Sequence, residues 1–131
     1  MADPLFHMVC VPAALESSEA WAAELLRDGD LALLIDGSGL DGINAIAHAL
    51  DQRTIALVRT EPDAAAQDET VIAHAAALPL VWVAKEFSPR ARSWARDRGP
   101  MTLLIETDGV LPDEERRRID RFVALLGRQA E

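Results

Sequence analysis

The stretch DLALLIDGSGLDGINAIAHAL, residues 30–50, contains the pattern that decides the fold. An unbroken apolar run, Leu31–Ile35, ends on Asp36 and three glycines. A segment with apolar residues at helical spacing, Asp41–Leu50, follows directly. An apolar run without polar alternation is typical of a strand that is covered on both faces. The stretch therefore predicts a buried strand, a tight turn and a helix.

The same unit recurs along the whole chain. The five predicted strands are Phe6–Val11, Leu31–Ile35, Thr54–Val58, Leu80–Ala84 and Met101–Ile105. The five predicted helices are Ser17–Arg27, Asp41–Leu50, Asp68–Ala77, Ser88–Arg98 and Pro112–Leu126. This order predicts an α/β three-layer sandwich, in which a five-stranded parallel sheet lies between layers of helices. In such sheets ligands bind outside the carboxyl ends of the strands, so the residues just after each strand are the site candidates.

Composition limits the function classes. The 131 residues suit one domain, 1–131, and no apolar run approaches the roughly 20 residues of a membrane span. The single Cys10 and an N-terminus unlike a signal peptide lead us to expect a cytoplasmic protein. The net charge of −9 repels phosphate backbones and anionic lipids, so we expect neither nucleic acid nor membrane as a partner. The three histidines, His7, His48 and His74, show no ligand spacing and are interpreted as structural or surface residues.

The glycines after the second predicted strand allow two interpretations. Gly37, Gly39 and Gly42 fit the G-x-G-x-x-G pattern of dinucleotide-binding turns, and Glu61 lies about where a ribose-binding acid is expected. However, Asp36 would repel a pyrophosphate bound at that turn. The alternative is that the glycines make a tight turn and that Asp36 is a solvated residue at the strand end.

The segment from Asp30 to Arg92 resembles a response-regulator receiver domain. DLALLIDGSGLDGINAIAHAL resembles the family's third strand, its phosphate-accepting Asp and the helix that follows. TIALVRTEPD resembles the fourth strand with its Thr or Ser, and ETVIAHAAALPLVWVAKEFSP resembles the fourth helix and the fifth strand with its Lys. Asp36, Thr60 and Lys85 follow in family order, each at a strand end. The resemblance implies a flavodoxin-like fold.

The first and last strands of the chain depart from the family order. A receiver begins with a strand that ends in acidic residues, and two strand–helix units precede its phosphate-accepting Asp. Here only one unit precedes Asp36, whereas MTLLIETDG, with Glu106 and Asp108, comes last. The chain thus resembles a circularly permuted or atypical receiver. The family's sheet order then implies that MTLLIE lies beside LALLID, which would bring the two acidic strand ends together.

The resemblance implies a function in two-component signalling or a phosphorelay. Asp36 would accept a phosphoryl group, with Thr60 and Lys85 contacting its oxygens. Mg²⁺ would be held by Asp36, by Glu106 or Asp108, and by a backbone carbonyl near Ser38. Enzymatic activity would be limited to self-phosphorylation and self-dephosphorylation. The expected partner is a protein, either a histidine kinase or a downstream protein; the oligomeric state is not predicted.

Two other functions remain open. A pseudo-receiver, which has the fold but is not phosphorylated, is favoured by Glu61 and Glu86, since the family has a small residue and a Pro at these positions. A small nucleotide-binding protein would use the glycine turn. Trp82 also has two interpretations: the resemblance implies an aromatic switch, whereas its apolar surroundings indicate a core residue.

Overall fold

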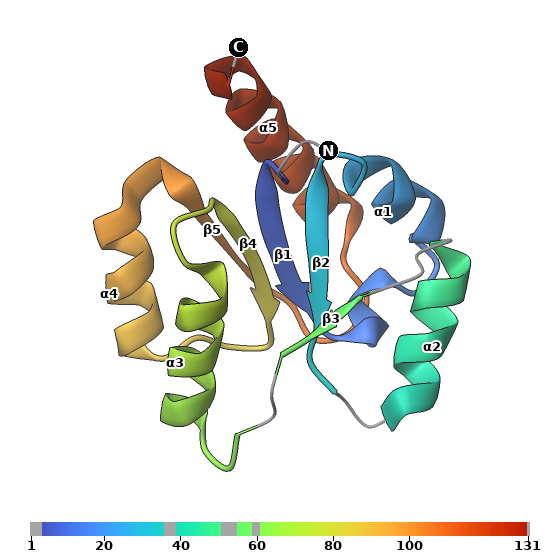
Figure 1. The fold of residues 1–131 in the computed structure, drawn as a ribbon, viewed down its shortest axis with the longest axis horizontal. Coiled ribbons are helices and arrows are strands. Elements are labelled where there is room, and N and C mark those ends of the chain that lie inside the picture. Colours follow the sequence, from blue (N-terminus) through green and yellow to red (C-terminus); the bar gives the residue numbers. More distant parts are fainter. Residues whose placement is uncertain (1–3, 36–38, 51–54, 59–60, 131) are drawn as a thin grey trace.

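The computed structural model describes residues 4–35, 39–50, 55–58 and 61–130, which form a parallel β-sheet with helices on both faces (Figure 1). The strands are β1 (Phe6–Cys10), β2 (Gly29–Leu33), β3 (Ala56–Leu57), β4 (Leu80–Ala84) and β5 (Thr102–Glu106). The α-helices are α1 (Glu19–Leu25), α2 (Gly39–Ala49), α3 (Ala64–Ala75), α4 (Pro89–Arg98) and α5 (Asp113–Ala130). Two short 3-10 helices, η1 (Pro12–Leu15) and η2 (Gly99–Met101), precede α1 and β5.

The predicted α/β three-layer sandwich is confirmed, and its five-stranded parallel sheet with five helices is consistent with a flavodoxin-like fold. The main differences in element boundaries have local causes. Helix α3 begins earlier than predicted, because the Asp63 side chain caps it by accepting a hydrogen bond from Ala66 N at 2.8 Å. Strand β3 is shorter than predicted, and its pairing with β2 covers Ala32 and Leu33.

The order of strands in the sheet is β3-β2-β1-β4-β5. The prediction that MTLLIE lies beside LALLID is therefore wrong: β5 pairs with β4 at one edge, whereas β2 lies between β1 and β3. Burial explains this arrangement. The side chains of β1 are almost all buried, which suits the central strand, whereas most of those of β5 are only half-buried, which suits an edge. The observed order equals the first five strands of the doubly wound order 3-2-1-4-5-6. It differs from the flavodoxin order 2-1-3-4-5, so the likeness to a flavodoxin-like fold concerns the layers and the parallel sheet and not the order of the strands.

The apolar core is divided by the sheet into two layers. On β1, Met8 and Cys10 face the layer formed with α1, α2 and α5, and Val9 faces the layer formed with α3 and α4. Figure 1 shows α3 and α4 together on one side of the sheet and α1 and α2 on the other. Because both faces are covered, the unbroken apolar runs in the sequence are explained. Within the described residues, no helix is long and apolar enough to cross a membrane.

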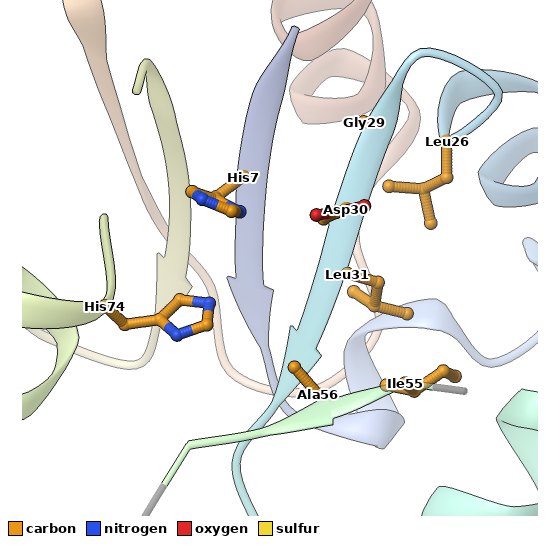
Figure 2. Close-up of a pocket in the computed structure, with 8 residues that line it drawn as sticks. All are labelled: His7, Leu26, Gly29, Asp30, Leu31, Ile55, Ala56 and His74. Carbon is orange, nitrogen blue, oxygen red and sulfur yellow. The ribbon is translucent and has the colours of Figure 1, made fainter. Parts of the chain in front are cut away.

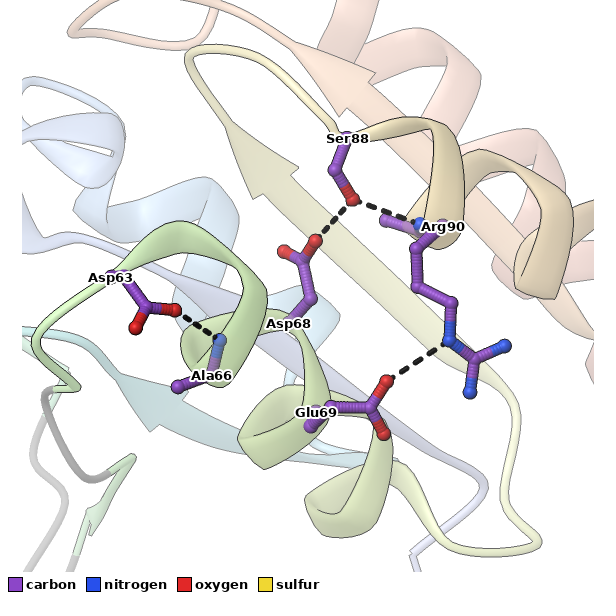
Figure 3. A network of polar contacts seen from close by, with 7 residues as sticks. Asp63, Ala66, Asp68, Glu69, Ser88 and Arg90 are labelled. Carbon is purple, nitrogen blue, oxygen red and sulfur yellow. Dashed lines mark hydrogen bonds and ion pairs between the residues drawn. The ribbon is translucent and has the colours of Figure 1, made fainter.

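A polar network connects α3 to α4 (Figure 3). The Ser88 hydroxyl donates a hydrogen bond to the carboxylate of Asp68, which is buried on α3. The same hydroxyl oxygen accepts a hydrogen bond from Ala91 N at 3.1 Å and so caps α4. Near the surface, Arg90 Nε donates to Glu69 Oε1 at 2.9 Å. Ser88 therefore joins a helix cap to a buried carboxylate and fixes the start of α4 against α3.

Candidate functional site

The carboxyl ends of the strands bring together several of the predicted site residues. Lys85 directly follows β4, Glu106 is the last residue of β5, and Asp108 lies in the loop after it. Because β4 and β5 are neighbours with Ala84 opposite Glu106, these three residues lie at the same edge of the sheet. We call this region, with the loop 107–112, the carboxyl edge. The doubly wound order places its topological switch point, the usual ligand position in such sheets, between β1 and β4.

The charged side chains of the carboxyl edge pair with one another. Lys85 Nζ lies 3.9 Å from Asp108 Oδ2, and these side chains are 77% and 80% exposed. Glu106 forms an ion pair with Arg92 of α4. Exposed ion pairs of this kind contribute only about 0–1 kcal/mol to stability. They nevertheless place a carboxylate beside each of the two cations, so neither cation is free of a local anion.

The loop after β5 crosses the switch point. Its Thr107 N donates a hydrogen bond to Ala84 O at 2.9 Å, and Leu111 N donates to Ala14 O of η1 at 3.0 Å. Leu111 itself is buried. Beneath this loop lies a largely apolar hollow of about 170 Å³, bordered by Val11 and Lys85. Sites for drug-sized ligands have volumes of about 300–1,000 Å³, so this hollow is too small for a nucleotide.

Three of the predicted site residues, Asp36, Ser38 and Thr60, lie outside the described residues. The sheet order nevertheless bears on the predicted magnesium site. Two strands, β1 and β4, lie between β2 and β5, so the ends of β2 and β5 are about 14 Å apart at the usual strand spacing of about 4.8 Å. The expectation that the acidic ends of these two strands adjoin each other is wrong. The assignment of Asp36, Glu106, Asp108 and Ser38 to Mg²⁺ stays a prediction without that support.

Trp82, the predicted switch aromatic, is a core residue. Its side chain is 3% exposed and packs edge-on against Phe87 and Trp94, with ring centroids 5.1 Å and 6.4 Å away. Such edge-to-face pairs stabilise a single ring position. The alternative interpretation of Trp82 as a core residue is thus the one that its packing supports.

Glu61, the residue after Thr60, is held by α3. Its carboxylate accepts a hydrogen bond from Thr70 Oγ1 at 2.8 Å, and its backbone N–H donates to Gln67 Oε1 at 3.0 Å. These contacts fix a negative charge next to the position where a receiver needs its Thr or Ser.

Other potential reactive groups are limited. Cys10 is fully buried at the end of β1, and burial raises the pKa of its thiol to about 12, so it is not a nucleophile at neutral pH. Among the residues that the structure describes, no group of three or more His, Cys, Asp or Glu side chains is placed to hold a metal ion.

A second polar region lies away from the carboxyl edge, and no motif or spacing in the sequence indicates it. His7 of β1 and His74 of α3, both interpreted from the sequence as structural or surface residues, have ring centroids 5.0 Å apart. They border a hollow of about 310 Å³ together with Asp30 of β2 (Figure 2). We call this region the histidine hollow. Spacing along the chain does not reveal it, because the two rings come from elements that only the fold brings together.

No protein-family model matches this chain, and no match was found among curated proteins or solved structures. The geometry of the site is therefore the basis for the functional inference.

Proposed function

We propose that this chain is a receiver-like interaction module that acts through contact with a partner protein and is not phosphorylated at Asp36. The observation that carries this proposal is the position of β5 at the sheet edge beyond β4. Receiver phosphorylation depends on a cation that offsets the charges of the acceptor carboxylate and the phosphoryl group. Glu106 and Asp108 belong to β5 and the loop after it, three strand positions away from β2, so they are not at the end of the strand that leads to Asp36 and would not help to bind a cation there.

The charges around the carboxyl edge support the same proposal. Lys85, which would contact the phosphoryl oxygens, faces Asp108, and Arg92 faces Glu106. The fixed carboxylate of Glu61 adds repulsion for a phosphoryl group near Thr60. A phosphorylated state would have to overcome these interactions before it gained any new contact.

Exposed apolar side chains near the ends of β2 and β3 are a candidate contact surface. Ile35, just after β2, is 44% exposed, Leu57 of β3 is 51% exposed, and Leu40 in the first turn of α2 is 59% exposed. Leu57 pairs in register with Leu33, so Ile35 follows at the same corner of the sheet. Exposed apolar side chains gathered at one corner are a common feature of protein–protein interfaces. A partner protein that covers this corner would remove them from water.

Phosphoryl acceptance at Asp36 with Mg²⁺ is the second candidate, and one observation favours it. In the receiver order, one strand separates the strand of the acceptor Asp from the strand of the Lys. Here β1 likewise separates β2, which leads to Asp36, from β4, which leads to Lys85. The spacing of these two strands is compatible with receiver chemistry, although the positions of β5 and of β3, which leads to Thr60, are not.

Intact mass after incubation with acetyl phosphate and Mg²⁺ separates the two candidates. We expect no phosphoryl adduct on the folded wild-type protein. An adduct that is present in the wild type and absent in Asp36→Asn would overturn the proposal in favour of the phosphoryl acceptor. Phosphorylation of a known receiver in the same reaction shows that the donor is active.

Photo-crosslinking in the source cells tests the contact surface. A crosslinking residue at Leu57 should capture one defined protein, whereas the same residue at Leu125 of α5 should not. Leu125 is a matched control because it is 52% exposed, close to the 51% of Leu57. It belongs to the C-terminal part of α5, and Figure 1 shows the C-terminal end of α5 far from β3. Equal capture from both positions, or from neither, would contradict a partner surface at the ends of β2 and β3.

A further inference from the structure

The histidine hollow lies beside the start of β2, next to the described pairing of β2 with β3. Pairing with β3 covers Ala32 and Leu33, whereas Gly29 and Asp30 at the start of β2 line the hollow. His7 lies opposite Asp30 in the register of β1 and β2. Figure 2 shows the His7 ring beside β1 and the His74 ring reaching toward it from α3, with the Asp30 carboxylate on the neighbouring strand. Three polar side chains from three elements therefore border one hollow.

Each imidazole has one nitrogen that is buried and unsatisfied. His7 Nδ1 and His74 Nε2 have no hydrogen-bond partner and almost no contact with solvent. A buried polar atom without a partner loses its interactions with water and gains nothing in return. A pair of such atoms on adjoining rings is a reason to look for a bound species that satisfies both.

The rings have the separation that two ligands of one metal ion require. Two imidazoles on one tetrahedral ion, with metal–nitrogen distances of about 2.0–2.1 Å, have ring centroids about 5 Å apart. The observed separation is 5.0 Å.

We propose that His7 and His74 together bind a divalent transition-metal ion, zinc foremost, at the wall of the histidine hollow. Imidazole nitrogen favours zinc, nickel and copper over the hard cations magnesium and calcium. Two protein ligands leave coordination positions for water, which the open hollow supplies, and the carboxylate of Asp30 offsets part of the ion's charge. The site is thus exchangeable, and it lies apart from the carboxyl edge.

Calorimetric titration of the untagged protein with Zn²⁺ tests this site. We expect one ion per chain, with affinity reduced about tenfold or more in His7→Gln and in His74→Gln. His48→Gln is the matched control, since His48 is exposed on α2 and should leave the affinity unchanged. A parallel titration with Mg²⁺ should show no dependence on either histidine, which distinguishes this site from any site at Asp36.

A second measurement covers the case in which a variant fails to fold. The ¹⁵N signals of the imidazole nitrogens of His7 and His74 in the wild-type protein should both shift on addition of Zn²⁺, while those of His48 should not. Absence of zinc binding, binding that survives in both variants, or a shift confined to His48 would overturn the proposal. None of these outcomes depends on whether Asp36 is phosphorylated or whether a partner binds near Leu57.

Discussion

The carboxyl edge and the histidine hollow treat polar groups in opposite ways. At the carboxyl edge, Lys85 and Asp108 are largely exposed and pair with each other. In the histidine hollow, nitrogens of His7 and His74 are buried and have no partner. Because water solvates the exposed pair at the carboxyl edge, that pair has little effect on the free energy of folding. The buried nitrogens of the histidine hollow have lost their interactions with water, which lowers stability. The contrast teaches that charged residues at predicted strand ends are weak indicators of a site, whereas unsatisfied buried atoms are stronger ones.

The largest expected effect tests whether Trp82, in β4 just before the carboxyl edge, is held in a single position in the core. Trp82→Ala should lower the free energy of unfolding by about 3–5 kcal/mol, because it removes a buried ring packed against Phe87 and Trp94. Leu57→Ala, at an exposed position, should change it by no more than about 0.5 kcal/mol. Urea denaturation measures both. A loss near 1 kcal/mol for Trp82→Ala would indicate the movable aromatic implied by the receiver resemblance.

The next prediction concerns the packing of Gly29, which lines the histidine hollow. A Cβ atom on Gly29 would lie 2.5 Å from the Phe6 ring, which is fully buried. Gly29→Ala should therefore destabilise the protein by about 1–3 kcal/mol, as overpacking does. Gly127→Ala is the matched control: nothing lies within 4 Å of its Cβ position in α5, so it should stabilise the helix by about 0.5–1 kcal/mol. Thermal denaturation that ranks the two variants in the opposite order would refute this packing.

A buried polar contact and an exposed ion pair on the same two helices sharpen the comparison further. Ser88→Ala removes the cap of α4 and leaves the buried Asp68 without its hydroxyl donor, so we expect a loss of about 1–3 kcal/mol. Arg90→Ala breaks an exposed pair with Glu69 between the same helices and should cost no more than about 1 kcal/mol. Chemical denaturation of the two variants side by side measures the difference. Equal losses would mean that burial does not strengthen this network.

The smallest effect is expected at the carboxyl edge itself. A double-mutant cycle of Lys85→Ala and Asp108→Ala should give a coupling free energy of about 0–1 kcal/mol, because both side chains are exposed. The coupling should decrease further as salt is added. A coupling free energy above about 2 kcal/mol, measured by urea denaturation, would show that the pair is held rigidly. It would then support a functional role for Lys85.

The sequence predicted the elements well because their signals are local. Apolar runs and helical spacing depend on neighbouring residues, so Leu80–Ala84 was predicted with the bounds that the structure has. The predicted start of α3 was too late, because the sequence does not show whether Asp63 is a loop residue or the N-cap of a helix. These local patterns do not predict the order of the strands in the sheet, because the apolar pattern of a strand does not indicate which strand lies next to it.

The candidate site was predicted only in part for the same reason. Lys85, Glu106 and Asp108 do lie at strand ends, as the alternation of strands and helices indicated. The distances between these residues depend on which strands are neighbours in the sheet. The prediction took the order of neighbours from the receiver family, and that order differs from the observed one. The pairing of His7 with His74 required the crossing of α3 back over β1, which no spacing rule contains.

The central position of β1 has a consequence for how the chain folds during synthesis. Strands β2 and β3 follow β1 closely, so half of the sheet can form as these residues leave the ribosome. The other edge of β1, where Met8 and Val9 later pair with β4, waits until Leu80–Ala84 has been made. During that interval a row of unpaired backbone groups on an apolar strand is open to other chains. The nascent protein is therefore most prone to aggregate between the completion of β3 and the arrival of β4.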